Sequence, residues 1–236
     1  MPEELARLWR IPAESKKGRP AKLDTCTVVS AAVALADAEG MDAVTLPRVA
    51  ADLGVTKMSL YRYVGSKDEL LVHMQDHAFG PAPERGDAGW REELKNWAFA
   101  QAEVMAEHPW LMDLPVSGPP RGPNAIDWLD AALSALRGTG LGVSEKLGIV
   151  TVVSTYARSS RQMSAEMASE RSAGTEQVEA EREWQAALFE LVDPERYPEA
   201  AGLMAEPVFE PAGEDAEFLF GLDLILDGVA VIADEK

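Results

Sequence analysis

The sequence predicts an all-α protein with a small N-terminal domain and a larger C-terminal helical bundle. Apolar residues recur every three or four positions through most of the chain, which is the spacing of amphipathic helices. No segment alternates apolar and polar residues between hairpin signals, so strands are not expected. The stretch GPAPERGDAG at residues 80–89 is rich in Gly and Pro and divides the chain. We therefore expect an N-terminal arm over residues 1–23, one domain over 24–80 and a second over 81–236.

Three helices are expected in the N-terminal domain, followed by a fourth that leads out of it. Each begins after an Asp, Thr or Ser, whose side chain can accept a hydrogen bond from a free amide of the first turn. The expected helices cover residues 25–39, 46–52, 57–64 and 67–79, and the capping residues are Asp24, Thr45, Thr56 and Ser66. Glu69 stands three residues after Ser66, as in a capping box. Gly40 ends the first helix, and Gly54 breaks the chain between the second and the third.

Four further helices are expected in the C-terminal domain. Their periodicity places them at residues 90–107, 124–137, 144–170 and 214–234. Loops rich in Gly and Pro separate the first three of these helices. The segment 175–192 is strongly charged, and we expect a helix there that partners the last one.

Acidic residues are concentrated in the C-terminal two-thirds of the chain. The formal net charge of the whole sequence is −18. Residues 1–80 carry 10 Lys and Arg against 11 Asp and Glu, whereas residues 81–236 carry 12 against 29. The basic residues of the arm stand in a short stretch without acids: Lys16, Lys17, Arg19 and Lys22. The negative net charge does not exclude a nucleic-acid partner, because binding to nucleic acid depends on where the positive charges lie.

Disulfides, a secretory signal and membrane spans are not expected. Cys26 is the only cysteine, which fits a reducing compartment. The longest apolar run, residues 218–232, is interrupted by Asp223 and Asp227 and is shorter than the roughly 20 residues of a span. We expect a soluble protein that acts in the cytoplasm.

The second and third helices have the pattern of a helix-turn-helix. The short connection between them contains Gly54, as this motif usually requires. Leu60 and Val64 are four residues apart and should pack inward, which leaves Lys57 and Arg62 facing outward. Both side chains can donate to guanine edges or to phosphates. A three-helix core with a solvated basic face is the alternative that this spacing alone leaves open.

Four sequence pieces stand in order between residues 31 and 71: ALADAEG, T-x-x-x-VA, LGV-x-x-x-x-LY-x-[YH]-V and K-[DE]-x-LL. Together they resemble the DNA-binding domain of the tetracycline-repressor (TetR) family. The resemblance implies a three-helix helix-turn-helix domain that binds double-stranded DNA. It assigns DNA-facing positions to Thr45, Arg48, Lys57, Met58, Ser59, Tyr61, Arg62, Tyr63 and Lys67, to which we add the capping Thr56.

One residue departs from the family pattern. Pro47 stands where the tetracycline repressor has an arginine that helps to read a base, so recognition here should depend more on the third helix. On that helix Met58 can touch a thymine methyl group, and Ser59 can contact a base or a phosphate. Tyr61 and Tyr63 can bind phosphates and fix the register without reading sequence.

The basic run of Lys16, Lys17 and Arg19 has two interpretations. It resembles the minor-groove hooks in which an arginine enters a narrow A·T groove. Alternatively, it is a solvated tail. Both interpretations predict additional DNA affinity that depends on salt.

The C-terminal half carries a second, less specific resemblance. EHPW at residues 107–110, GPN at 122–124 and the helix end before Gly140 are similar to the C-terminal domain of the tetracycline-repressor branch. This implies a helical bundle for ligand binding and dimerisation, with a small-molecule effector as partner.

A cavity in such a bundle is apolar with a few polar groups that orient the ligand. The candidate ligand-binding residues are Trp97, Met105, Trp110, Trp128, Thr155, Tyr156, Arg158, Ser159, Gln162 and Met163. Arg158 is the best candidate to face an anionic or carbonyl group. The alternative is that most of the aromatic and Met residues are ordinary core.

The last helix predicts a homodimer. It is apolar on nearly every side except for Asp223 and Asp227, so it must be buried on most faces. Gly221 and Gly228 are seven residues apart and would allow a helix of a second subunit to approach closely. In the family, two subunits form a four-helix bundle in this way.

Enzyme activity is not expected, and we predict neither a cofactor nor a metal. His73 and His77 could offer two metal ligands, but no third is evident. His108 could act as a base, but it precedes Pro109 at a helix end, where a structural role is more usual. The remaining alternative is a helical protein-interaction module whose basic face is incidental.

These observations together predict a ligand-responsive, DNA-binding transcriptional regulator. Two recognition helices of a dimer would lie about 34–36 Å apart and read a palindromic operator. We expect the effector to move the fourth helix, change this spacing and release the DNA, so a repressor is favoured over an activator.

Overall fold

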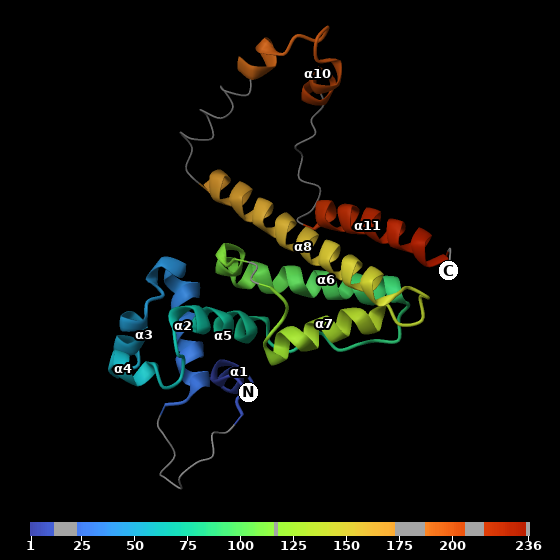
Figure 1. Ribbon diagram of the computed structural model, residues 1–236. Coiled ribbons are helices and arrows are strands. Elements are labelled where there is room, and N and C mark those ends of the chain that lie inside the picture. Colours follow the sequence, from blue (N-terminus) through green and yellow to red (C-terminus); the bar gives the residue numbers. More distant parts are fainter. Residues whose placement is uncertain (12–22, 116–117, 173–186, 206–214, 235–236) are drawn as a thin grey trace.

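The computed structural model describes residues 1–11, 23–115, 118–172, 187–205 and 215–234 (Figure 1). Within these ranges the regular structure is helical and there are no strands, which confirms the predicted all-α class. The N-terminal helices form one group, and the long helices of the second domain form a bundle beside it. None of the described helices is both long and apolar enough to cross a membrane.

The helices of the N-terminal domain begin where the capping residues predict. They are α2 (Thr25–Glu39), α3 (Leu46–Asp52), α4 (Lys57–Leu60) and α5 (Lys67–Phe79), with a short turn of helix, η1 (Met41–Ala43), after α2. Three caps form: Asp24 accepts from the amide of Thr27 at 2.7 Å, Thr45 from Arg48 at 3.3 Å and Ser66 from Glu69 at 3.0 Å. Each satisfies an amide that has no partner within its own helix.

Helix α4 is shorter than predicted. It ends at Leu60 instead of near Val64, because the chain tightens into a turn in which the Tyr63 amide donates to the Leu60 carbonyl at 2.8 Å. Thr56 caps no amide, and its hydroxyl instead lies 3.0 Å from that of Ser59. Leu60 and Val64 are fully buried, so the inward face of the motif is as predicted.

A short helix, α1 (Glu3–Leu8), forms within the segment for which only an arm was predicted. Its Arg7 guanidinium pairs with the carboxylate of Glu69 on α5, with an Nη2–Oε2 distance of 2.8 Å, and Leu8 is buried. Six residues are too few to make a stable helix alone or a clear periodic pattern. Docking on α5 therefore accounts for this helix.

The second domain contains the four helices that the sequence predicts, with ends within two residues of the expected ones. The elements are α6 (Trp90–Glu107), η2 (Pro109–Asp113), α7 (Pro123–Ala135), α8 (Val143–Ser172), α10 (Pro198–Ala205) and α11 (Ala216–Asp234). Most of the charged segment 175–192 lies outside the described residues.

Two hydrophobic cores meet at α5. Leu70 and Met74 of this helix are fully buried in the core of the N-terminal domain, and Trp110 of η2 fills the same core. The second core lies between α6, α7, α8 and α11. Phe79 at the end of α5 and Val104 of α6 pack against both cores. The domains are therefore joined by packed side chains as well as by the chain.

Helix α11 uses its polar residues within its own subunit. Asp223 accepts from Lys95 of α6 at 3.1 Å, and Asp227 pairs with Arg91 at 2.6 Å. A Cβ on Gly221 would lie 2.2 Å from the Tyr156 hydroxyl of α8. Gly221 therefore permits close packing inside the subunit, which corrects the expectation that it serves a second subunit. A Cβ on Gly228 would meet nothing within 4 Å.

Candidate DNA-binding surface and ligand cavity

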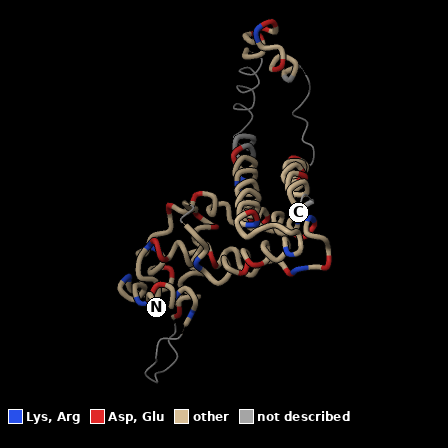
Figure 2. Tube along the Cα trace, turned by 45° about the vertical axis from the view of Figure 1, so that its right-hand side comes forward, with Lys and Arg blue, Asp and Glu red and all other residues tan. Residues whose placement is uncertain are grey.

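The helix-turn-helix presents the predicted DNA-facing side chains at one end of the molecule. Exposed side chains are those of Thr45, Arg48, Thr56, Lys57, Met58, Tyr61, Arg62 and Lys67. Ser59 and Tyr63 are half-buried. Lys and Arg residues are visible at the end of the trace that carries α4 (Figure 2). This surface combines cations, hydroxyls and one apolar side chain, a mixture suited to phosphates and base edges.

The two exposed arginines of this surface differ in their partners. Arg48 pairs with Glu39 at 2.7 Å and with Asp52 at 3.3 Å, and these hydrogen bonds raise the pKa of its guanidinium. For Arg62, no acidic partner lies within ion-pairing distance among the residues that the structure describes. Arg62 is thus available to an anion directly, whereas Arg48 must first leave its carboxylates.

The basic arm is outside the described part of the chain. Lys16, Lys17 and Arg19 all fall between residues 12 and 22. Their assignment to DNA rests on the sequence.

A cavity of about 310 Å³, here called the inner cavity, lies between the domains. Helix α5 forms one wall, and α6, α7, α8 and a Gly- and Pro-rich loop form the others. Its lining residues are Val72, Gln75, Asp76, Phe79, Gln101, Gly118, Pro119, Pro120, Arg121, Gly122, Ala125, Trp128 and Ser154. The volume is at the lower end of the range for small-molecule sites.

Gln101 is the one lining residue whose buried polar atom lacks a partner. The residue is 7% exposed, and its Oε1 accepts no hydrogen bond from any residue that the structure describes. Leaving such an oxygen unpaired is costly. The burial of Gln101 could have been predicted from the sequence, because Gln101 lies on the same face of its helix as the buried Trp97, Ala98 and Met105.

The cavity is tied to α5 through Asp76. Its carboxylate accepts from the Ala125 amide at 2.9 Å, in the first turn of α7, and its carbonyl accepts from the Asn124 side chain at 2.7 Å. Burial raises the pKa of the Asp76 carboxyl. Gly122 makes the approach possible, since a Cβ there would lie 1.9 Å from the Asp76 Oδ1. Helix α5 therefore caps α7.

Comparison with known proteins identifies the chain. Residues 28–74 match the model of bacterial regulatory proteins of the tetR family, and residues 82–232 match the tetracyclin repressor-like C-terminal domain. The protein belongs to the TetR family. Both resemblances found in the sequence are thereby confirmed, and this TetR-family protein is a DNA-binding transcriptional regulator.

Relatives of this TetR-family regulator match it over nearly the full chain. The HTH-type transcriptional repressor DrrR1 of Streptomyces coeruleorubidus is 35% identical over 98% of this chain and 86% of its own. Apo ActR from Streptomyces coelicolor is 26% identical, with a TM-score of 0.74 over 90% of this chain and 99% of its own. The complex of ActR with actinorhodin gives 26% identity and a TM-score of 0.73, over 88% and 95%.

Most of the predicted ligand-binding residues of this regulator do not meet in one cavity. Only Trp128 lines the inner cavity, while Trp110 and Gln162 line a separate cleft between η2 and α8. Trp97 and Met105 are buried in helix packing. The indole N–H groups are used inside the protein: Trp97 donates to the Trp128 carbonyl at 2.9 Å, Trp128 to Gly80 at 3.1 Å and Trp110 to Asp37 at 2.6 Å.

The predicted residues of α8 have structural bonds or face outward. Arg158 donates to the carbonyls of Met112 and Leu114 at 2.6 and 2.7 Å, so it holds the chain after η2 in place. The hydroxyl of Tyr156 donates to the Phe218 carbonyl at 3.0 Å, and that of Thr155 to its own helix. The remaining predicted residues of this helix are exposed: Ser159, Gln162 and Met163.

A second contact joins the domains of the regulator on the side of η2. Asp37 of α2 accepts from the Trp110 indole and lies 2.7 Å from the His108 Nδ1. His108 therefore has a structural role at the helix end, as the sequence predicted for it. This contact adds to the polar attachments that Asp76 and the Trp128 indole make between the ligand-binding domain and the DNA-binding domain.

Proposed function

We propose that this regulator is a repressor that leaves a palindromic operator when a small, largely apolar molecule fills the inner cavity. The proposal rests on the position of α5, which belongs to the DNA-binding domain and also lines the inner cavity. This helix follows the recognition segment directly, and it also provides Val72, Asp76 and Phe79 to the cavity wall. A ligand that displaces α5 therefore acts on both domains at once.

The ligand is proposed to contain aromatic rings. Phe79 and Trp128 line the cavity and pack edge to face, with centroids 5.5 Å apart, so they offer aromatic surfaces. ActR, which has a similar fold, has been crystallised in complex with actinorhodin, and this supports a small-molecule ligand here.

DNA recognition is proposed to rest on α4 and the turn after it. Arg62, Lys57 and Met58 would meet base edges, with Ser59 beside them, since their side chains stand at the open end of the motif. The phosphate contacts would come from Thr45, Arg48, Thr56, Tyr61, Tyr63, Lys67 and the arm residues Lys16, Lys17 and Arg19. As a DNA-binding regulator, the protein would act in the cytoplasm.

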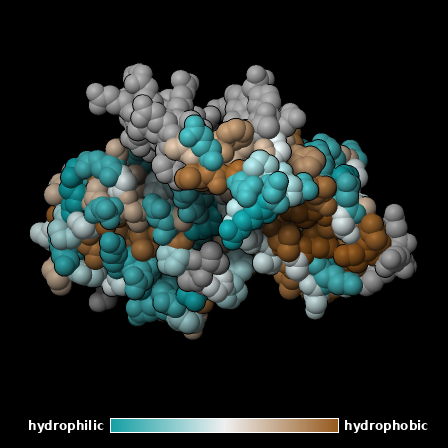
Figure 3. Space-filling model, turned by 90° about the horizontal axis from the view of Figure 1, so that it is seen from above, coloured by the Kyte–Doolittle hydropathy of each residue, from teal (hydrophilic) through white to brown (hydrophobic). Residues whose placement is uncertain are grey.

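A homodimer is proposed to form through α8 and α11. Large apolar side chains on these helices are exposed in the single chain: Leu147, Val152, Phe220, Leu224, Val231 and Ile232. Figure 3 shows hydrophobic residues gathered on the side of the molecule that carries α11. A patch of this kind usually marks a protein interface. In a dimer, two α4 helices about 34–36 Å apart would read the two halves of a palindrome.

The ligand proposal is tested with protein purified from its native host. Native mass spectrometry should detect a small molecule bound to the wild type, and the Ser154→Trp variant, whose indole fills the inner cavity, should lack it. Arg137→Ala, on an exposed position outside the cavity, is the matched control. A molecule that remains bound to Ser154→Trp would place the ligand elsewhere and contradict the proposal.

A further inference from the structure

The segment over residues 61–66, here called the recognition turn, connects α4 to α5 and carries Arg62. Its inner side is fixed by packing, because Val64 is fully buried. Its end is fixed by α5, where the Glu69 carboxylate accepts a hydrogen bond from the Gly65 amide at 2.9 Å. The position of this carboxylate therefore determines where the chain lies three residues after Arg62.

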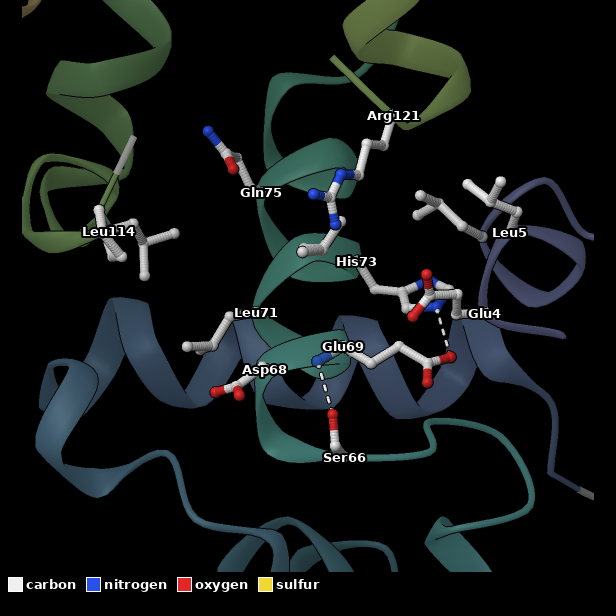
Figure 4. A pocket seen from close by; sticks show the side chains of 13 residues that line it. Glu4, Leu5, Ser66, Asp68, Glu69, Leu71, His73, Gln75, Leu114 and Arg121 are labelled. Atoms are coloured by element: carbon white, nitrogen blue, oxygen red, sulfur yellow. Dashed lines mark hydrogen bonds and ion pairs between the residues drawn. The ribbon is translucent and has the colours of Figure 1, made fainter. Parts of the chain in front are cut away.

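The Glu69 carboxylate is held in turn by α1. Arg7 of this helix donates to both of its oxygens, with an Nη2–Oε2 distance of 2.8 Å. Only 25% of the Arg7 side chain and 11% of the Glu69 side chain are exposed. A bidentate pair of this kind fixes the direction of a carboxylate as well as its distance. Figure 4 looks into the cavity of about 490 Å³ that α1 and α5 border, and it shows α1 beside the first half of α5 with the Glu69 side chain extending toward it.

Gly65 leaves room for this ion pair against the recognition turn. A Cβ at this position would lie 2.6 Å from the Glu69 Oε2 and 2.8 Å from the Arg7 Nη2. A side chain on residue 65 would thus displace the carboxylate or the guanidinium, because close-packed groups do not overlap. The recognition turn, α5 and α1 therefore meet at one point.

The other end of α1 is attached to the ligand-binding domain. Just after the helix, the Trp9 indole donates to the Arg121 carbonyl at 2.8 Å. Arg121 belongs to the loop that lines the inner cavity. Leu8, which stands between the two attached residues of this segment, is buried. Helix α1 therefore connects this loop to the recognition turn along a path that is separate from the backbone of α5.

We infer that α1 positions the recognition turn for DNA, with Arg7 acting through Glu69 on the Gly65 amide. Arg7 is thus a positioning residue and makes no DNA contact of its own. Without it, the carboxylate loses the partner that fixes it, and the turn that carries Arg62 is held less firmly. Because Trp9 attaches α1 to the loop of the inner cavity, this loop has a second route to the DNA-binding surface. That last step rests on the proposed function, since it needs a ligand that moves the loop.

The first test is a double-mutant cycle between Arg7 and Glu69, measured by fluorescence anisotropy with the DNA upstream of the regulator's own gene. Arg7→Met should weaken binding about fivefold, because the charged hydrogen bonds that fix the carboxylate are lost. In the Glu69→Gln background the same change should have little effect, because Arg7 acts through Glu69. An arginine that bound a phosphate directly would cost the same factor in both backgrounds, and this result would overturn the inference.

Matched variants separate positioning from other effects. Arg137→Met makes the same change at an exposed arginine after α7 and should leave DNA binding unchanged. Gly65→Ala should weaken binding about as much as Arg7→Met, whereas Gly89→Ala, whose Cβ meets nothing within 4 Å, should not. Thermal unfolding shows whether each variant is folded at the temperature of the titration. Lower melting temperatures with unchanged DNA affinity would show that α1 only stabilises the fold, which also overturns the inference.

A second cycle tests the route from the loop. Trp9→Phe removes the indole donor but keeps an aromatic ring, so it should weaken DNA binding about two- to threefold. With Arg7→Met already present it should change nothing more, because α1 is then disconnected from Glu69. Equal losses in both backgrounds, or none in either, would refute this route. Both cycles are measured without a ligand, whereas the proposed function fails separately, if the Ser154→Trp variant keeps its bound molecule.

Discussion

Arg62 and Arg48 illustrate how much of the DNA contact depends on the surroundings of single residues. Both are exposed at the helix-turn-helix, but only Arg48 is held by two carboxylates. The sequence could assign both arginines to the predicted DNA-facing surface, because the residues of a helix-turn-helix have a fixed spacing. The sequence could not show the ion pair with Glu39, since Glu39 and Arg48 belong to different helices and meet only in the fold.

We predict that Arg62→Ala weakens binding to the DNA upstream of the regulator's own gene by about tenfold or more, because it removes an unpaired cation from the recognition surface. Arg48→Ala should weaken it less, since Arg48 must leave Glu39 and Asp52 to reach a phosphate. Fluorescence anisotropy with labelled DNA measures both. The reverse order of the two effects would contradict this account.

A pH-dependent stability is predicted at Asp76. Burial raises the pKa of this carboxyl in the folded state, so the folded protein holds the proton at a higher pH than the unfolded chain does. The stability contributed by the neutral carboxyl is therefore lost as the pH rises through its raised pKa. Asp76→Asn carries no charge to bury, so its free energy of unfolding relative to the wild type should increase as the pH rises from about 4, near the ordinary pKa of an Asp, through the raised pKa of Asp76. Urea unfolding of both proteins at several pH values measures this difference in the free energy of unfolding. A difference that does not change with pH would contradict the prediction.

The helices themselves could be predicted well from sequence, and the reason is their caps. Asp24, Thr45 and Ser66 each bind an amide of the first turn, which is a local interaction visible as a residue type next to a periodic segment. Helix α1 was missed because its stability comes from α5, far away in the chain. For a related reason, the sequence could not show that most of the predicted ligand-binding residues do not line one cavity. Which of the helical aromatic residues face a cavity depends on how the helices pack.

At the scale of elements, we predict that Gly122→Ala disrupts the contact between α5 and α7. Its Cβ would collide with the Asp76 carboxylate, so the variant should lose about 1–3 kcal/mol of stability. Gly148→Ala is the matched control, because a Cβ there meets nothing within 4 Å. Replacing a Gly inside α8 with Ala should increase the free energy of unfolding by about 0.5–1 kcal/mol. Thermal unfolding compares the two, and equal stabilities would show that the close approach at Gly122 is not needed.

At the scale of the whole molecule, the proposed dimer rests on the exposed apolar faces of α8 and α11. Phe220 is 68% exposed and Leu224 is 58% exposed in the single chain. We predict that Phe220→Asp converts the dimer to a monomer in size-exclusion chromatography with light scattering, because a charge would have to be buried at the interface. Met58→Asp, an equally polar change on the DNA-binding end, should leave the dimer intact. A dimer that survives Phe220→Asp would exclude this face as its centre.

The asymmetry of charge is also a property of the whole chain. Nearly all of the net charge of −18 lies after residue 80, so the proposed DNA contacts lie in the part of the chain whose charges nearly balance. In the proposed function, the ligand-binding domain acts on DNA through α5 without contacting it.

The most direct test measures operator affinity with and without the small molecule recovered from the native protein. Anisotropy titrations of the wild type should show affinity lowered about tenfold or more by that molecule, which is a common size for coupling between sites. Ser154→Trp should bind DNA equally well in its presence and absence. The account is contradicted if the molecule leaves the wild type unchanged, or if it weakens both proteins to the same extent.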